Sequence, residues 1–157
     1  MEKYPKLLLF LLRVSLGWLF LYAGLTKLLD PTWTSEGYLT GAKAFTGFFS
    51  WLASPDLLPI VDFMNEWGLT LLGVSLILGL FVRLSAMLGA LLMLLYYLPL
   101  GLPFPDEHSL IVDDHIVYAL TLLYFAAVRA GRTYGLENFC AKLPVCKRFP
   151  KLRNFLG

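Results

Sequence analysis

The chain has 157 residues, of which 58% are hydrophobic and 15% are charged, and its formal net charge is +2. With a mean hydropathy of +0.68, it carries more apolar side-chain surface than a soluble domain of this size can bury. The composition therefore excludes an ordinary water-soluble enzyme and favours a one-domain membrane protein. The alternative is an unusually apolar soluble helical bundle, which the sorting of the charges along the chain disfavours.

The predicted fold is all-α, an integral membrane four-helix bundle. A helix needs about 20 apolar residues to cross the hydrocarbon core, and it satisfies its own backbone hydrogen bonds there. Four apolar segments are expected to cross, at about 5–29, 60–82, 84–101 and 113–130. The first contains Arg13 and Lys27, and it is too long to be a cleaved secretory signal. The third has Pro99 near its far end.

The loop between the first two spans is expected to contain an additional amphipathic helix. Its apolar side chains Phe45, Phe48, Phe49 and Leu52 follow the i, i+3, i+4, i+7 spacing of one helix face. Such a helix would lie on the outer membrane surface or dip into it as a lid. A helix that only caps the bundle is the alternative.

The basic residues predict how the chain is oriented. With a cytoplasmic N-terminus and four crossings, eleven of the thirteen lysines and arginines fall on the cytoplasmic side. Because short cytoplasmic loops carry an excess of basic residues, we predict a multi-pass protein of the plasma membrane with both termini cytoplasmic. Residues 1–136 form the predicted membrane domain, and residues 137–157 form a basic tail that would lie on anionic lipid.

The fourth span is short and begins with acidic side chains. The 14 residues from His115 to Val128 extend roughly 21 Å as a helix, whereas the hydrocarbon core is about 30 Å thick. Unless Arg129 snorkels, Asp113, Asp114 and His115 must sit at or below the outer boundary, facing the bundle interior or a wet cavity. A structural role is the alternative, with Asp113 capping the helix and His115 hydrogen-bonded in place.

The other spans carry polar residues that would meet this group. On the first span, one helix face combines basic, aromatic and glycine residues, namely Arg13, Gly17, Phe20, Gly24 and Lys27. We take Arg13, Lys27, Glu66, Tyr96 and Tyr118 as candidate substrate-binding residues. Two alternatives stay open. Lys27 and Glu66 would serve equally as a plain ion pair between helices, and Arg13 would either snorkel to lipid phosphate or bind an anion.

The sequence indicates no metal and no nucleotide, and nucleic acid is not an expected partner. Asp113, Asp114 and His115 are adjacent and expected to point in different directions, unlike metal ligands spaced four apart on a helix. No CxxC, haem-attachment motif or glycine-rich phosphate loop is present. Cys140 and Cys146 fit neither a zinc nor a thioredoxin motif. In the reducing cytoplasm, ordinary thiols are expected rather than a redox pair.

Three stretches resemble a known family: RVSLGWLFLYAGLTKLLDP, NEWGLTLLGVSLILGLFVRLSAMLGALLMLLYYL and DDHIVYALTLLYFAAVRAGRTYGLE. They are similar to the DoxX family, including the related DoxD subunit of thiosulfate:quinone oxidoreductase, over roughly residues 10–136. The resemblance implies a four-helix membrane protein that takes part in quinone-linked oxidation of sulfur compounds. It transfers no catalytic residue.

We therefore expect a membrane subunit of a quinone-linked redox system that binds a quinone, or a small anion such as thiosulfate, at the outer end of the bundle. Asp114 or His115 would pass protons, Tyr96 and Tyr118 would contact the ring, and Lys27 would attract an anionic substrate. Electrons would come from a redox partner protein or a soluble donor, and a homo-oligomer is left open. The rival hypothesis is a non-enzymatic membrane scaffold or a small-solute permease, whose polar residues serve packing.

Overall fold

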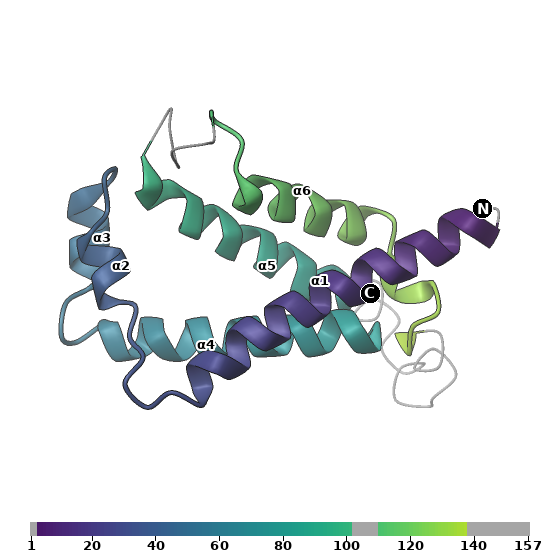
Figure 1. Ribbon diagram of the computed structural model, residues 1–157, viewed down its shortest axis with the longest axis horizontal. Coiled ribbons are helices and arrows are strands. Elements are labelled where there is room, and N and C mark those ends of the chain that lie inside the picture. Colours follow the sequence, from purple (N-terminus) through teal and green to yellow (C-terminus); the bar gives the residue numbers. More distant parts are fainter. Residues whose placement is uncertain (1–2, 102–109, 138–157) are drawn as a thin grey trace.

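The structure is a computed structural model that describes residues 3–101 and 110–137, all of whose regular elements are helical (Figure 1). Cys140, Cys146 and most of the basic tail lie outside the described residues. The elements are α1 (Lys3–Leu28), α2 (Glu36–Thr40), α3 (Thr46–Leu52), α4 (Leu58–Leu78), α5 (Val82–Tyr97), α6 (Asp114–Ala127) and two short 3-10 turns, η1 (Leu98–Leu100) and η2 (Ala130–Arg132). The predicted all-α class is confirmed.

Three helices are long and apolar enough to cross a membrane: α1, α4, and α5 together with η1. α6 is also apolar but shorter, at 14 residues. The observed helix ends differ from the predicted ones by a few residues. α4 stops at Leu78 rather than near residue 82, because Gly79 adopts a left-handed conformation (φ 67°) that glycine reaches without steric cost.

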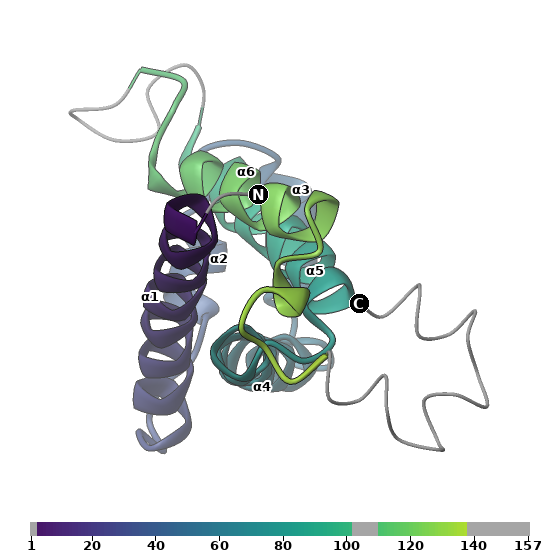
Figure 2. The ribbon, with the colours of Figure 1, turned by 90° about the vertical axis from the view of Figure 1, so that its right-hand side faces the viewer.

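The four longest helices are arranged as two packed pairs, α1 with α4 and α5 with α6. The pairs approach each other where α4 turns into α5, and they diverge toward α2 and α3 (Figure 1). Viewed from the right-hand side of Figure 1, α4 is seen nearly end-on, with α1 to its left and α5 and α6 above it (Figure 2). We call the end with α2 and α3 the loop end, and the opposite end, with the start of α1 and residues 129–137, the terminal end.

Glycines allow α1 and α4 to approach closely. A Cβ atom on Gly17 would lie 2.9 Å from the Cβ of Leu76, and one on Gly73 would lie 2.6 Å from the Cα of Leu21. Gly24 likewise faces the backbone of Thr70 without room for a side chain. In a membrane, helix association depends on such close packing, because lipid is as apolar as the helix surface. The glycines of α1 and α4 therefore set the close spacing of this helix pair.

The core lies between the pairs, while the outer helix faces carry large apolar side chains. Leu76, Leu122 and Phe125 are fully buried. Leu71 and Leu120, in contrast, are 59% and 62% exposed. Apolar side chains on the outside as well as the inside of helices this long are typical of a protein surrounded by lipid.

The loop between α1 and α4 contains α3 in the predicted segment and also α2, which the sequence pattern did not indicate. The side chains of α3 are buried unevenly. Phe49 is only 2% exposed, whereas Phe48 and Phe45 are 46% and 63% exposed. Phe45 precedes the helix in a left-handed conformation, so the predicted apolar face is buried only in part.

Hydrogen bonds attach this loop to both helix pairs. On α4, the Asp62 carboxylate accepts from the backbone N–H of Ser35 at 2.8 Å and from the Thr34 hydroxyl at 2.9 Å. On the other side, the Tyr38 hydroxyl donates to the backbone oxygen of Tyr96 on α5. The loop therefore bridges the two pairs where they diverge.

Candidate functional site

The head of α6 is organised by Asp113, a buried carboxylate whose side chain is 3% exposed. One of its oxygens accepts from the backbone N–H of Ile116 at 3.1 Å, which caps the helix. The other lies 2.6 Å from Nδ1 of His115. A buried carboxylate is stable only when hydrogen-bonded in this way. Asp113 thus fixes both the start of α6 and the orientation of the imidazole ring.

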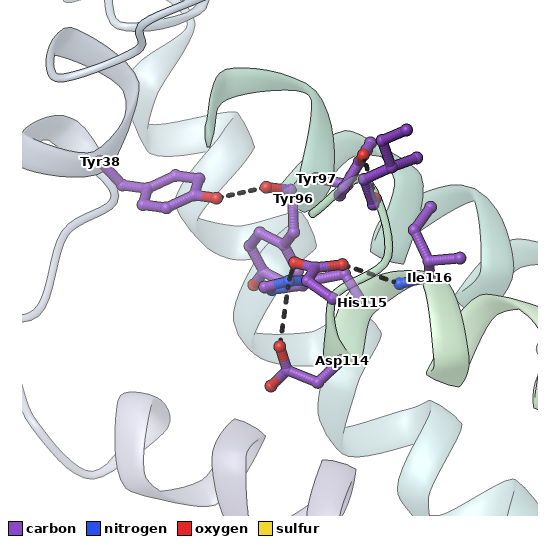
Figure 3. A network of polar contacts seen from close by, with 8 residues as sticks. Tyr38, Tyr96, Tyr97, Asp114, His115 and Ile116 are labelled. Atoms are coloured by element: carbon purple, nitrogen blue, oxygen red, sulfur yellow. Dashed lines mark hydrogen bonds and ion pairs between the residues drawn. The ribbon is translucent and has the colours of Figure 1, made fainter. Parts of the chain in front are cut away.

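Asp114 is placed differently from its neighbour. Its side chain is 70% exposed, and its nearer oxygen lies 3.9 Å from Nδ1 of His115. Figure 3 shows it pointing away from the tyrosines that surround His115. Asp114 and His115 were predicted to pass protons, and in the structure the carboxylate bonded to the His115 ring is that of Asp113, which is also the buried one.

Tyr96, near the end of α5, lies next to one polar side chain from each of α1, α4 and α6. Its hydroxyl donates to the side-chain oxygen of Asn65 on α4 at 2.6 Å. Its ring centroid lies 5.8 Å from that of His115 on α6 and 5.8 Å from the ammonium nitrogen of Lys27 on α1. We call Lys27, Asn65, Tyr96, Asp113 and His115 the loop-end cluster.

Lys27 is held by aromatic rings rather than by a direct ion pair. Its ammonium nitrogen lies over the ring of Trp33 at 5.1 Å as well as over Tyr96, a cation–π arrangement. Glu66 contributes a favourable electrostatic interaction, but no salt bridge joins the two among the described residues. The alternative of a plain ion pair between Lys27 and Glu66 is therefore not found among the described residues, where the ammonium group lies over two aromatic rings and has no hydrogen-bond acceptor.

Two further tyrosines lie next to the cluster and form hydrogen bonds to backbone oxygens. Tyr97 donates from its hydroxyl to the backbone oxygen of Ile111, and Tyr38 donates to that of Tyr96 (Figure 3). Burial, together with the negative charge of Asp113, raises the pKa of Tyr38 to about 12. Tyr38 is therefore a neutral phenol near neutral pH and acts as a hydrogen-bond donor.

The remaining predicted binding residues, Tyr118, Glu66 and Arg13, are not members of the loop-end cluster. Tyr118 packs edge-on against Phe20, with ring centroids 6.0 Å apart, at the margin of the hydrophobic core. Glu66 is half-buried beside Lys27. Arg13 is at the terminal end, 14 residues along α1 from Lys27, which is roughly 21 Å of helix. Arg13 and Tyr118 are therefore not part of the loop-end cluster.

Arg13 is completely buried, so it does not snorkel. Its guanidinium donates to the backbone oxygens of Ala130 at 3.1 Å and of Tyr134 at 3.4 Å. The backbone N–H of Glu137 donates in turn to the oxygen of Gly79 at 3.0 Å. Helix ends leave backbone carbonyls without partners, which is costly away from water. Arg13 and the returning segment satisfy these groups, so the role of Arg13 in this structure is to hold the terminal end together.

The head of α6 also has to be considered as a metal site. One possible ligand atom from each of Asp113, Asp114 and His115 lies within 4.8 Å of the others, so the expectation that they point apart is wrong. The reason is that Asp113 precedes the helix in an extended conformation. Both of its oxygens already accept hydrogen bonds, and a metal ion would have to replace them. We propose no metal here.

Three residues around the site were not selected from the sequence: Asn65, Trp33 and Tyr38. Asn65 gave a usable signal, because an amide within an apolar membrane helix is costly unless it is hydrogen-bonded. Trp33 and Tyr38 lie in the loop between spans. No periodicity there indicates which aromatic side chains turn inward.

Long apolar helices with a polar cluster at one end define a multi-pass integral membrane protein. The chain belongs to the DoxX family, whose model matches residues 8–99. The matched range includes Lys27, Asn65 and Tyr96 and ends before α6, which supplies Asp113 and His115. Searches of curated proteins and of solved structures gave no match.

Proposed function

We propose that the chain crosses the plasma membrane four times, with the loop end outside and both termini in the cytoplasm. The loop-end cluster would bind the headgroup of a membrane quinone. The protein would then serve as the membrane subunit of a quinone-linked redox system. As the resemblance to the DoxD subunit implies, the electron donor would be a reduced sulfur compound such as thiosulfate, used directly or through a partner protein.

The proposal rests mainly on the side chains that surround Tyr96. An aromatic ring, a cation that donates to no acceptor among the described residues, and an imidazole meet at the end of an apolar helix group. A quinone headgroup is a flat ring with carbonyl oxygens, so it needs aromatic surface for the ring and donors for the oxygens. Tyr96 and Trp33 offer the first, and Lys27 offers the second. Its positive charge would also stabilise negative charge developing on the ring oxygens.

The pair of Asp113 and His115 fits the handling of protons. Nδ1 of His115 is engaged with the buried carboxylate at 2.6 Å, which leaves Nε2 to accept or donate a proton. An imidazole held at one nitrogen by a carboxylate is a common proton-transfer group in proteins. A quinone accepts two electrons and two protons. In this proposal the chain supplies the binding site and the proton path, while the donor supplies the electrons.

Binding of a short-tailed quinone analogue tests the proposal. We expect the analogue to quench tryptophan fluorescence of the purified protein saturably, and Lys27→Met and His115→Ala each to weaken its affinity by about tenfold. That factor corresponds to about 1.4 kcal/mol, near the lower end for a hydrogen bond to a charged group. Asp114→Asn is the matched control and should leave affinity unchanged.

Unchanged affinity in both site variants would exclude the loop-end cluster as the quinone site. Lost folding in Lys27→Met, with no quinone binding by the wild type, would favour the scaffold hypothesis. Solute uptake by proteoliposomes without any electron donor would favour a permease.

A further inference from the structure

Asn65 is a polar side chain on the core-facing side of α4. It is 6% exposed, and Leu69, Leu72 and Leu76, which follow it at helical spacing, are buried as well. Residues at this spacing share one helix face, so Asn65 lies between α4 and the other helices rather than on the outer surface. An amide in such a place is costly unless its polar atoms have partners. Its presence on the core face therefore needs a physical reason.

Only one end of the Asn65 amide has a partner within the chain. The side-chain oxygen accepts from the Tyr96 hydroxyl at 2.6 Å, which links α4 to α5. The amide nitrogen carries two N–H donors, and it makes no hydrogen bond among the described residues. The fully enclosed side-chain atoms without a partner in that part of the chain are Nε of Arg13 and Oε2 of Glu137, both at the terminal end. The amide nitrogen of Asn65 is therefore not sealed in the core, and a bound molecule can reach it.

Lys27 provides a second set of donors beside the same tyrosine. Its ammonium nitrogen lies 5.8 Å from the ring centroid of Tyr96 and has no hydrogen-bond acceptor among the described residues. Tyr96 also fixes the rotation of the Asn65 amide, because the oxygen is bonded to its hydroxyl and the N–H₂ group is the end that remains. Two groups next to Tyr96, one from α1 and one from α4, are therefore donors without an acceptor.

We propose that Asn65 donates a hydrogen bond from its amide nitrogen to one carbonyl oxygen of the quinone ring, and that it thereby favours the oxidised ring over the hydroquinone. This inference rests on the proposed function and names the redox form that the site selects. A carbonyl oxygen only accepts hydrogen bonds, whereas each hydroxyl of the reduced ring also has a hydrogen that needs an acceptor. With its oxygen turned toward Tyr96, Asn65 does not supply one. The reduced ring would therefore be released more readily than the oxidised ring.

The test compares a tail-less quinone with its hydroquinone, each titrated calorimetrically into purified protein in detergent under anaerobic conditions. We expect the wild type to bind the quinone about tenfold more tightly than the hydroquinone, the effect of about one hydrogen bond. Asn65→Leu, which keeps the size of the side chain but removes its donors, should weaken the quinone by about that factor and the hydroquinone much less. Tyr96→Phe keeps the aromatic ring but frees the amide to rotate, so the ratio of the two affinities should move toward one.

Thr70→Val is the matched control on the same helix. It also removes a buried polar group of α4, but the Thr70 hydroxyl donates within that helix, to the backbone oxygen of Glu66 at 2.8 Å. Both affinities should therefore stay at their wild-type values.

The proposed function and this inference fail in different ways. If the wild type binds neither ring, the proposed function fails, and the role of Asn65 fails with it. If the wild type binds both rings equally, or if Asn65→Leu weakens both by the same factor, Asn65 only links α4 to α5 and this inference alone is overturned. Tighter binding of the hydroquinone would mean that the amide oxygen faces the ring, which also overturns it. Should Asn65→Leu not fold, Tyr96→Phe decides, because an unchanged affinity ratio in that variant contradicts the proposal.

Discussion

Replacing Asp113 by alanine should destabilise the protein far more than replacing its neighbour Asp114. The change removes the cap on the backbone N–H of Ile116 at 3.1 Å and the partner of His115 at 2.6 Å. Loss of an N-cap costs about 1 kcal/mol, and loss of a hydrogen bond involving a charged group costs about 1.5–3 kcal/mol. We therefore expect the free energy of unfolding to fall by about 2–4 kcal/mol.

The adjacent aspartate supplies the control. Asp114 is 70% exposed and contributes only a favourable charge near the start of α6, so Asp114→Asn should cost under about 1 kcal/mol. Asp113→Asn keeps an oxygen that can cap the helix and should fall between the two. The assay is unfolding of purified protein in mild detergent, followed by far-ultraviolet circular dichroism, with hydrogen exchange in the first turn of α6. Equal destabilisation by the changes at 113 and 114 would refute the assignment of Asp113 as the organising carboxylate.

Three further predictions concern packing, the terminal end and pH. Gly73→Leu should lower the free energy of unfolding by more than about 1–3 kcal/mol in thermal melts, because the new side chain would overlap the backbone of α1. Gly37→Leu, at a position with open space around it, should have little effect in the same melts. Arg13→Met should destabilise by about 1–3 kcal/mol in denaturant titrations, because it leaves the buried backbone oxygen of Ala130 without its donor, while Glu137 keeps its ion pair with Arg132. An unchanged titration would show that the Arg13 guanidinium does not hold the terminal end together. Burial and Asp113 raise the pKa of Tyr38 to about 12, so its contribution to stability is present below pH 10 and is lost as the pH rises toward 12. Tyr38→Phe should flatten that decline and remove one late-ionising phenol from the ultraviolet titration.

Hydrophobic patterning was sufficient to predict the long helices and part of the site. Long apolar runs can be nothing but helices in a membrane, and this predicts α1, α4 and α5 without reference to tertiary contacts. The 3.6-residue period also placed Lys27 on the glycine face of α1 that packs against α4. Tyr96 and His115 could be assigned to the same end of the molecule as Lys27. Tyr96 lies near the end of the third predicted span and His115 near the start of the fourth, so both face the loop that joins these spans.

Where the prediction failed, the cause was local backbone geometry or contact between distant residues. Asp113 and Asp114 are equivalent by composition, and only the extended conformation of Asp113 before α6 turns its carboxylate back onto the helix. Arg13 is buried because it donates to the oxygen of Ala130, 117 residues away in the chain. No periodicity within α1 contains that information. The hydrogen bond from Tyr38 to the backbone oxygen of Tyr96 likewise depends on how the loop folds over α5.

Photolabelling with an azidoquinone, followed by mapping of the modified peptides, is the most direct test of the proposed quinone site at the loop end. We predict saturable labelling of peptides that contain Lys27, Tyr96 or His115, with competition by unlabelled quinone and reduced labelling in Lys27→Met. Labelling confined to peptides of the terminal end around Arg13, or labelling that unlabelled quinone does not displace, would contradict the assignment.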